Sequence, residues 1–139
     1  MLLRAIWAPT VFGVAGAVFD AEGRVLLVRH RYNPGWRLPG GGVGRGELPQ
    51  KAILRELAEE VGLTGGVPEF FGLYVSKAGW VSNVVALYRV RGGSVNFRPN
   101  LEIKEICFAD LKQPPKGCSR ATLRRLRELS GDAAPSAKW

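Results

Sequence analysis

The amino-acid sequence predicts an α+β protein, an α/β/α sandwich in which a mixed β-sheet lies between helices. The order of its segments predicts this class: several strands, one central helix, more strands and a final helix, without the strict alternation of a doubly wound fold. The length of 139 residues suits one domain and not two. We therefore expect a single domain over residues 1–130 and, because residues 131–139 are rich in alanine and proline, a flexible tail after it.

The first thirty residues predict two strands. The apolar run 5–19 has some features of a signal peptide, but a proline interrupts it and it is shorter than the ~20 residues of a membrane-spanning helix. β-Branched and aromatic residues over 11–19 favour a buried strand instead. Residues 24–30 indicate a second strand, and with the turn-like residues 20–23 they predict a hairpin. A loop and a short extended segment, 36–39, are expected to follow.

The middle of the chain joins a glycine-rich segment to clear helix signals. Five of the seven residues 40–46 are glycine, which predicts neither a helix nor a good strand there. Residues 48–61 are predicted to be helical, because Pro49 suits the first turn of a helix and Gly62 suits its C-terminal cap.

The second half of the chain predicts three more strands and the final helix. Two long apolar runs, 69–76 and 81–90, have strand-like composition, and a shorter strand is expected near 103–108. Ser119 is a suitable N-cap for a helix over 120–129, whose apolar residues recur on one face.

Charge and composition narrow the classes of function. The net charge of +8 favours polyanionic partners, although an incidental basic charge explains it equally well. A single histidine, His30, disfavours Ser-His-Asp and Cys-His mechanisms, and such a residue is more typical of surface or packing positions. Cys107 and Cys118 are too few for a disulfide framework or a zinc site. Because no segment suits a membrane-spanning helix, a cytoplasmic, reducing location without a membrane partner is expected, and both cysteines should be free thiols. Chemistry based on carboxylates and a metal ion is therefore expected before chemistry based on a serine or cysteine nucleophile.

The predicted central helix carries three carboxylates on one face. Glu56, Glu59 and Glu60 lie at positions i, i+3 and i+4, and the opposite side of the helix is apolar. A solvated acidic face is one interpretation of this pattern. The other is a site for Mg²⁺ or Mn²⁺, because a hard divalent cation turns the repulsion between carboxylates into binding.

The segment from Gly41 to Leu63 resembles the Nudix box. Gly41 is followed after five residues by Glu47, and after seven more by Arg-Glu-Leu-Ala-Glu-Glu-Val-Gly-Leu, which fills every specified position of the family's pattern. The resemblance extends over residues 10–130 and implies the Nudix fold. It also implies metal-dependent hydrolysis of the pyrophosphate linkage in a nucleoside diphosphate joined to another moiety.

The resemblance also implies roles for individual residues. The expected ligands of Mg²⁺ or Mn²⁺ are the side chains of Glu56, Glu59 and Glu60 and the main-chain carbonyl of Gly41. Either Glu56 or Glu59 would help to deprotonate the attacking water. Glu47 and Arg55 would form a structural ion pair that joins the glycine loop to the helix.

Residues outside this core of the motif are further candidates. An extra carboxylate could come from Glu102 or Glu105, although either also suits a plain surface position. The candidates for substrate binding are Arg29, Arg31, Arg37, Gly40 and Gly42. The aromatic rings of Trp36, Phe70 and Tyr74 could stack on a base, but aromatic residues beside strands are more often part of the core.

The substrate stays open at this point. The candidates are ADP-ribose-like compounds, nucleotide sugars and (deoxy)nucleoside triphosphates. The alternative partner is nucleic acid, either for an RNA 5′-end pyrophosphohydrolase or for a basic RNA-binding module, because the final helix carries four arginines: Arg120, Arg124, Arg125 and Arg127. A solvated basic face explains these arginines as well. The oligomeric state is open, with a homodimer as one alternative.

Overall fold

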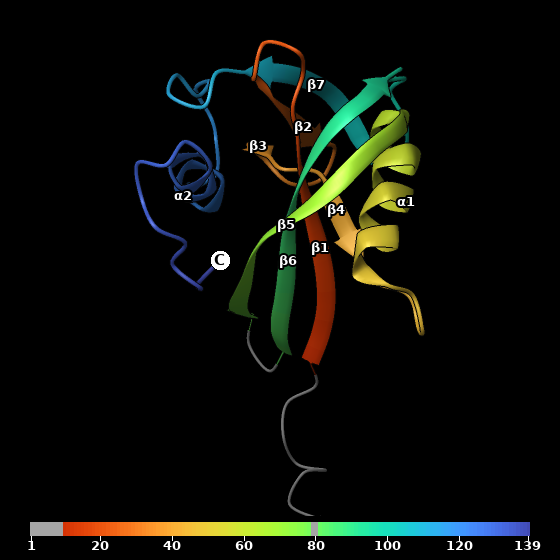
Figure 1. Cartoon of the computed structure of the whole chain (residues 1–139), viewed down its shortest axis with the longest axis vertical. Helices are drawn as coiled ribbons and strands as arrows, with labels where there is room; N and C mark the ends of the chain where they lie inside the picture. The colour runs from red at the N-terminus through yellow and green to blue at the C-terminus, as the bar shows by residue number, and fades with distance from the viewer. Residues whose placement is uncertain (1–9, 79–80) are drawn as a thin grey trace, which may run out of the picture.

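The computed structural model describes residues 10–78 and 81–139, which form two sheets with one helix on each side (Figure 1). In chain order the elements are β1 (Thr10–Val18), β2 (Val25–His30), β3 (Trp36–Arg37), β4 (Gly40–Gly42), α1 (Pro49–Val61), β5 (Leu63–Ala78), β6 (Val81–Val95), β7 (Ile103–Ala109) and α2 (Arg120–Leu129). A four-stranded mixed sheet has the order β4-β1-β6-β5, and a three-stranded sheet has the order β3-β2-β7. The predicted α+β class and its layers are confirmed. Residues 1–9, which include the start of the apolar run 5–19, lie outside the described residues.

The predicted hairpin of the first two strands is wrong beyond its turn. The turn is present, with the Gly23 amide donating to the Asp20 carbonyl at 3.1 Å, and a single bridge joins Phe19 to Val25. Apart from that bridge, the two strands do not pair with each other. β1 pairs with β4 and β6, and β2 pairs with β3 and β7. The physical reason is burial: both strands carry consecutive buried residues. Only a central place in a covered sheet buries both faces of a strand.

The glycine-rich segment also differs from its prediction, because Gly40–Gly42 forms strand β4, which pairs antiparallel with β1. The missing side chains are what allows the pairing. A Cβ atom on Gly40 would collide with the Val14 carbonyl, and one on Gly41 would collide with the Glu56 carboxylate. Glycine therefore brings this strand close both to β1 and to the acidic side of α1.

Both helices begin and end where the sequence predicts. Pro49 opens α1, and Gly62, at φ 69°, closes it by donating its amide to the Ala58 carbonyl at 3.2 Å. At the start of α2, the Ser119 hydroxyl accepts the Thr122 amide at 3.1 Å. These caps satisfy main-chain groups that a helix end would otherwise leave without partners.

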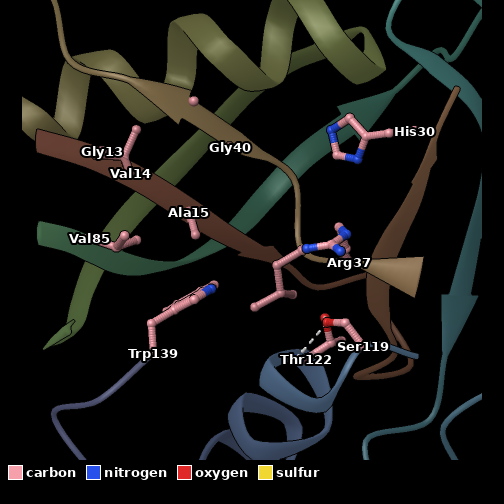
Figure 2. A pocket seen from close by; sticks show the side chains of 12 residues that line it. Gly13, Val14, Ala15, His30, Arg37, Gly40, Val85, Ser119, Thr122 and Trp139 are labelled. Carbon is pink, nitrogen blue, oxygen red and sulfur yellow. Dashed lines mark hydrogen bonds between the residues drawn. The ribbon is translucent and has the colours of Figure 1, made fainter. Parts of the chain in front are cut away.

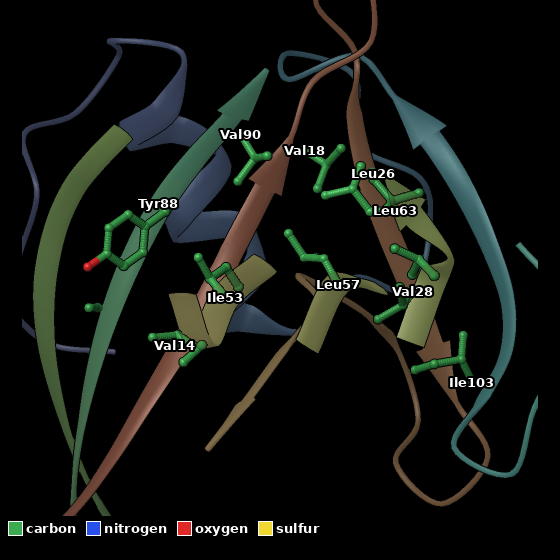
Figure 3. Close-up of a cluster of buried hydrophobic side chains, with 13 residues drawn as sticks. Val14, Val18, Leu26, Val28, Ile53, Leu57, Leu63, Tyr88, Val90 and Ile103 are labelled. Atoms are coloured by element: carbon green, nitrogen blue, oxygen red, sulfur yellow. The ribbon is translucent and has the colours of Figure 1, made fainter. Parts of the chain in front are cut away.

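Alternate residues of β1 and β2 face two separate apolar cores, one under each helix. Ile53, Leu57 and Val61 of α1 pack into the first core, which also holds Val18 of β1 and Leu26 of β2 (Figure 3). Leu126 and Leu129 of α2 pack into the second, with Ala17 of β1 and Leu27 of β2. The strands thus fix α1 and α2 on opposite sides of the molecule.

Strand β5 is longer than predicted, since it starts at Leu63, directly after α1. Gly65 and Gly66 adopt positive φ angles and Pro68 interrupts the strand pattern, so the sequence there is typical of a turn. β5 is an edge strand, where a proline costs no interior hydrogen bond. Its partner β6 extends to Val95, beyond the predicted end at 90.

The sequence predicts a flexible tail over residues 131–139. In the structure, residues 131–136 are hydrogen-bonded to the end of α2, and residues 137–139 pair with Val75 of β5. The Val75 amide donates to the Ala137 carbonyl at 2.9 Å, and the Trp139 amide donates to the Val75 carbonyl at 3.1 Å. The edge of β5 has main-chain groups that no neighbouring strand uses, and these groups bind the end of the chain.

Among the described residues, no helix has the length and apolar character needed to cross a bilayer.

Candidate active site

The three carboxylates of α1 differ in burial although they share one side of the helix. The Glu60 side chain is 3% exposed, that of Glu56 is 15% exposed, and that of Glu59 is 61% exposed. Glu60 lies closest to the core and Glu59 closest to solvent. We call Glu56, Glu59 and Glu60 the acidic ridge. Because its members range from exposed to buried, the ridge differs from an acidic face that is fully solvated.

Arg55 is the hub of hydrogen bonds on this side of α1. Its guanidinium contacts Glu47 through Nε and Nη2 at 2.8 and 2.9 Å, so the ion pair expected between these residues is present. The same group contacts Glu56 at 3.0 Å and the Gly42 carbonyl at 3.0 Å. Hydrogen bonds from Arg55 and from the Gly44 amide lower the pKa of Glu47 to about 2. The pair holds the glycine loop against the helix.

No nearby group fully compensates the negative charge that Glu60 carries when it is ionised. Burial, together with the charges of Glu56 and Glu102, raises its pKa to about 8. Its Oε1 lies 3.8 Å from His30 Nε2, while its Oε2 has no hydrogen-bond partner among the described residues. Burial and the charge of Arg37 lower the pKa of His30, so this histidine is neutral near pH 7 and supplies no counter-charge.

The donor set suits a hard divalent cation. Carboxylate oxygens that raise one another's pKa, one of them buried without a partner, are the groups that Mg²⁺ or Mn²⁺ would stabilise. Within residues 10–78 and 81–139 these side chains do not already converge as a metal cluster. Arg55 accounts for this arrangement, because it binds Glu56 and also reaches Glu59 at 3.4 Å.

The two carboxylates considered outside the motif have different surroundings. Glu102 lines a cavity of about 240 Å³ together with Glu59 and Glu60. Glu105 instead pairs with Arg29 at 2.7 Å, on the sheet of β2 and β7. The structure thus brings Glu102, and not Glu105, to the acidic ridge.

Asn100 positions Glu102, and the sequence reasoning missed it. Its Oδ1 accepts the amides of Glu102 and Ile103 at 3.0 and 2.8 Å, and its Nδ2 donates to the Glu60 carbonyl at 3.0 Å. An asparagine just before a strand is a turn-forming signal that could have identified it.

A second cavity, of about 200 Å³, lies beside the ridge (Figure 2). Gly41 and His30 line it, and each also touches the acidic side: Gly41 packs against Glu56, and His30 lies next to Glu60. Arg37 lines it too, with a buried Nε that has no partner in the described part of the chain. Gly40 is a further lining residue. Two residues that line the cavity thus also contact carboxylates of α1.

The remaining substrate-binding candidates have other contacts. Arg29 lies over the Trp36 ring at 4.5 Å from its centroid, in addition to its pair with Glu105. Arg31 donates to the Asn100 carbonyl at 2.6 Å and so supports the loop that carries Glu102. The Gly42 carbonyl accepts a hydrogen bond from Arg55. Of the three arginines, Arg37 is the one that lines the cavity.

The aromatic candidates are placed elsewhere, and another ring takes the position beside the cavity. Trp36 and Tyr74 are buried in the core under α2, and Phe70 is exposed on β5. The ring that lines the cavity is Trp139. Sequence reasoning did not consider Trp139, because it lies in the segment that was expected to be a flexible tail. A tryptophan among small and polar residues was a signal that could have identified it.

The basic face predicted for α2 is smaller than the sequence indicates. Arg125 is fully buried and pairs with Glu128 at 3.0 Å. Arg124 is exposed but donates to the main-chain oxygen of Trp139. Arg120 and Arg127 remain as exposed positive charges on this helix. The correction follows from helix geometry, since one of the four arginines faces the apolar core.

Comparison with known proteins identifies relatives of this arrangement. The family model described as the NUDIX domain matches residues 9–128. The chain is 33% identical over 106 residues to an ADP-ribose pyrophosphatase of Methanocaldococcus jannaschii, covering 71% of this chain and 62% of the relative. It is 35% identical over 68 residues to an RNA pyrophosphohydrolase of Gluconobacter oxydans, covering 48% and 37%. The chain therefore spans less than two thirds of the length of either relative.

The fold has close structural counterparts as well. The crystal structure of a MutT NUDIX hydrolase from Burkholderia pseudomallei superposes with a TM-score of 0.76, covering 86% of this chain and 98% of that one, at 23% identity. At that identity the likeness concerns the fold. This likeness agrees with the α/β/α sandwich that the sequence predicts.

Proposed function

The chain belongs to the Nudix family, and we propose that it hydrolyses the pyrophosphate linkage of a nucleoside diphosphate joined to another moiety. The observation that carries the proposal is that two residues contact both the acidic ridge and the cavity beside it. Gly41 packs against Glu56, His30 lies next to Glu60, and both also line the cavity beside α1. A substrate in the cavity would place its phosphates against the carboxylates.

The proposed metal ligands are Glu56, Glu59 and Glu60 and the Gly41 carbonyl, with Glu102 as a further carboxylate at the ridge. A bound Mg²⁺ or Mn²⁺ would supply activation of water and neutralisation of charge on the leaving phosphate. Proteins of this family generally use divalent metal ions. The unpartnered Oε2 of Glu60 is the feature of this chain that a cation would satisfy.

Two side chains have proposed roles in the chemistry itself. Glu56 is the better candidate for accepting the proton of the attacking water, because burial raises its pKa and it lies against Gly41. The guanidinium of Arg37 would donate to a phosphate oxygen in the cavity, which gives its free Nε a partner. Glu47 and Arg55 hold the loop in place and take no part in bond breaking.

A substrate panel tests this function. ADP-ribose-like compounds, nucleotide sugars and (deoxy)nucleoside triphosphates are incubated with Mg²⁺ or Mn²⁺, and released phosphate or nucleoside monophosphate is measured. The relative named ADP-ribose pyrophosphatase favours including the first class. We expect turnover of at least one class, abolished by EDTA. Absence of turnover with every compound and both metals would contradict the proposal.

The competing hypothesis is an RNA substrate with a triphosphorylated or capped 5′ end. A relative named RNA pyrophosphohydrolase and the exposed Arg120 and Arg127 favour it, while the burial of Arg125 weakens it. Each phosphate contact with single-stranded RNA adds about −0.7 to the slope of log K against log salt concentration. Faster turnover of 5′-triphosphorylated RNA than of any small nucleotide, with tight binding at physiological salt, would favour this hypothesis.

A further inference from the structure

The cavity beside α1 has two chemically different ends. On one side lie Arg37 and His30, which is next to Glu60, and on the other lies the indole of Trp139 (Figure 2). Its volume of about 200 Å³ is below the ~300–1,000 Å³ of a typical small-molecule site, so a nucleotide that reaches both ends would extend partly outside it. The polar end suits phosphates, which leaves the aromatic end for another group.

Trp139 is held in place by main-chain and ring contacts. Its amide donates to the Val75 carbonyl at 3.1 Å, and its ring meets the Tyr74 ring edge-to-face, with centroids 5.5 Å apart. The Arg125 guanidinium lies 5.1 Å from the centroid of the indole and also donates to the Trp139 main-chain oxygen at 3.2 Å. The ring is therefore fixed before any ligand arrives.

The residues that hold Trp139 are themselves fixed by a buried polar cluster. Glu128 accepts a hydrogen bond from the Tyr74 hydroxyl at 2.5 Å, from Arg125 at 3.0 Å and from the Ser136 amide at 3.1 Å. This cluster joins α2 and β5 to the segment after α2. A preorganised aromatic surface binds a flat ligand at low entropic cost, because little side-chain freedom is lost on binding.

We infer that Trp139 is the residue on which the nucleobase of the substrate stacks. The inference deepens the proposed function and rests on it, since it assigns the base end of the same nucleotide. Stacking on an indole is tolerant of base identity, because every base has a π-face. The substrate class that follows is the nucleotides as a group, and phosphorylated sugars without a base lack this interaction.

Direct binding without metal or turnover tests the inference. Binding of AMP, GMP, CMP and UMP, and of ribose 5-phosphate, is measured by calorimetry in EDTA for the wild type, Trp139→Ala and Trp139→Phe. We expect Trp139→Ala to weaken nucleoside monophosphate binding by about 5- to 150-fold, the range for losing one base–aromatic stack. Ribose 5-phosphate binding should not change, and Trp139→Phe should retain most of the affinity.

Phe70→Ala is the matched control. Phe70 is also an aromatic residue of the β5 side, but it is 57% exposed and contacts Tyr88 instead of the cavity. It should leave the affinity for all five compounds unchanged. Equal weakening of ribose 5-phosphate and nucleotides by Trp139→Ala would show that Trp139 only supports the cavity, and that result would overturn the inference. Unchanged nucleotide binding, or a wild type that binds both kinds of compound alike, would overturn it too.

The two proposals fail separately. Turnover in the substrate panel with an unaltered nucleotide KM in Trp139→Ala would leave the proposed function intact and contradict the stacking role. Base-dependent binding that Trp139→Ala abolishes, combined with no turnover of any panel compound, would contradict the hydrolase function and retain the role of Trp139 in binding. If both hold, Trp139→Ala should raise KM and leave kcat nearly unchanged, since the ring lies across the cavity from His30, the neighbour of Glu60 (Figure 2).

Discussion

Helices α1 and α2 each bury charged side chains, but the charges on α1 share one sign while those on α2 are paired. On α1, the buried Glu60 has one oxygen without a partner among the described residues, and the charges of neighbouring carboxylates help to raise its pKa to about 8. On α2, Arg125 and Glu128 are 0% and 3% exposed and lie 3.0 Å apart. Tyr74 and Ser136 also donate to the Glu128 carboxylate.

The difference separates a cluster that holds the fold together from the cluster that we propose as the metal site. A buried pair with its hydrogen bonds satisfied holds the surrounding elements in one arrangement, and here it joins α2 to β5. Buried like charges without compensation destabilise the metal-free fold, and a cation removes that cost. Charge balance within each cluster therefore supports a structural role for the α2 pair and the proposed metal-binding role for the α1 carboxylates.

The largest expected effect comes from removing one charge at a time from the ridge. Glu56→Gln, Glu59→Gln and Glu60→Gln should each lower kcat, by about 10²- to 10⁴-fold for Glu56 if it is the base. The Tm of the metal-free protein should stay constant or rise, most of all for Glu60→Gln above pH 8, where the wild-type Glu60 carries a buried charge. Turnover assays and thermal unfolding in EDTA measure the two effects.

The metal-induced rise in Tm should shrink in the same variants, because a ligand stabilises a protein only in proportion to its affinity. Variants that lose stability yet keep full metal-dependent turnover would show that the ridge is structural. The contrast with α2 would then disappear.

The α2 cluster should show the opposite pattern. Arg125→Met leaves Glu128 buried without its cation, so the free energy of unfolding should fall by about 3–5 kcal/mol. The double variant Arg125→Met/Glu128→Leu should recover much of that loss, because no unpaired charge stays buried. Denaturant unfolding of the wild type, the single variant and the double variant measures the coupling. A single variant as stable as the wild type would refute a structural role for the pair.

The pH dependence of stability should sharpen the contrast. The pKa of Glu60 rises from an ordinary 4.5 to about 8 in the folded protein, so the folded state binds more protons than the unfolded state between these values. Its contribution to stability is full below pH 4.5 and is lost as the pH rises toward 8. The metal-free Tm of the wild type should fall over this range more steeply than that of Glu60→Gln. Equal slopes would argue against an uncompensated Glu60.

The smallest effect is expected at the ion pair that supports the ridge from outside. Glu47→Gln removes the partner of Arg55, so Tm should fall, by less than in Arg125→Met because Glu47 lies near the surface. The pKa of Glu47 is lowered to about 2, so the wild-type stabilisation is present above pH 4.5 and is lost as the pH falls toward 2. Turnover should decline only as a consequence of the looser loop. Loss of kcat with unchanged Tm would move Glu47 into the chemistry.

The sequence by itself determined the local features of the protein. The residues of the 41–63 segment specify the helix, its caps, its carboxylate side and the Glu47–Arg55 pair, because all of these depend on neighbours within a few helical turns. The apolar side of each helix followed from periodicity for the same reason. Family membership rests on that same short segment and extends over residues 9–128.

Only the tertiary structure decided which of these features meet. It placed β1 and β2 in separate sheets, brought Glu102 rather than Glu105 to the ridge, and set Trp139 beside the cavity. It also buried Arg125. Periodicity assigns a side chain to a face, but what that face contacts depends on strand pairing between residues far apart in the chain. A lone carboxylate, arginine or tryptophan therefore acquires its role from long-range packing.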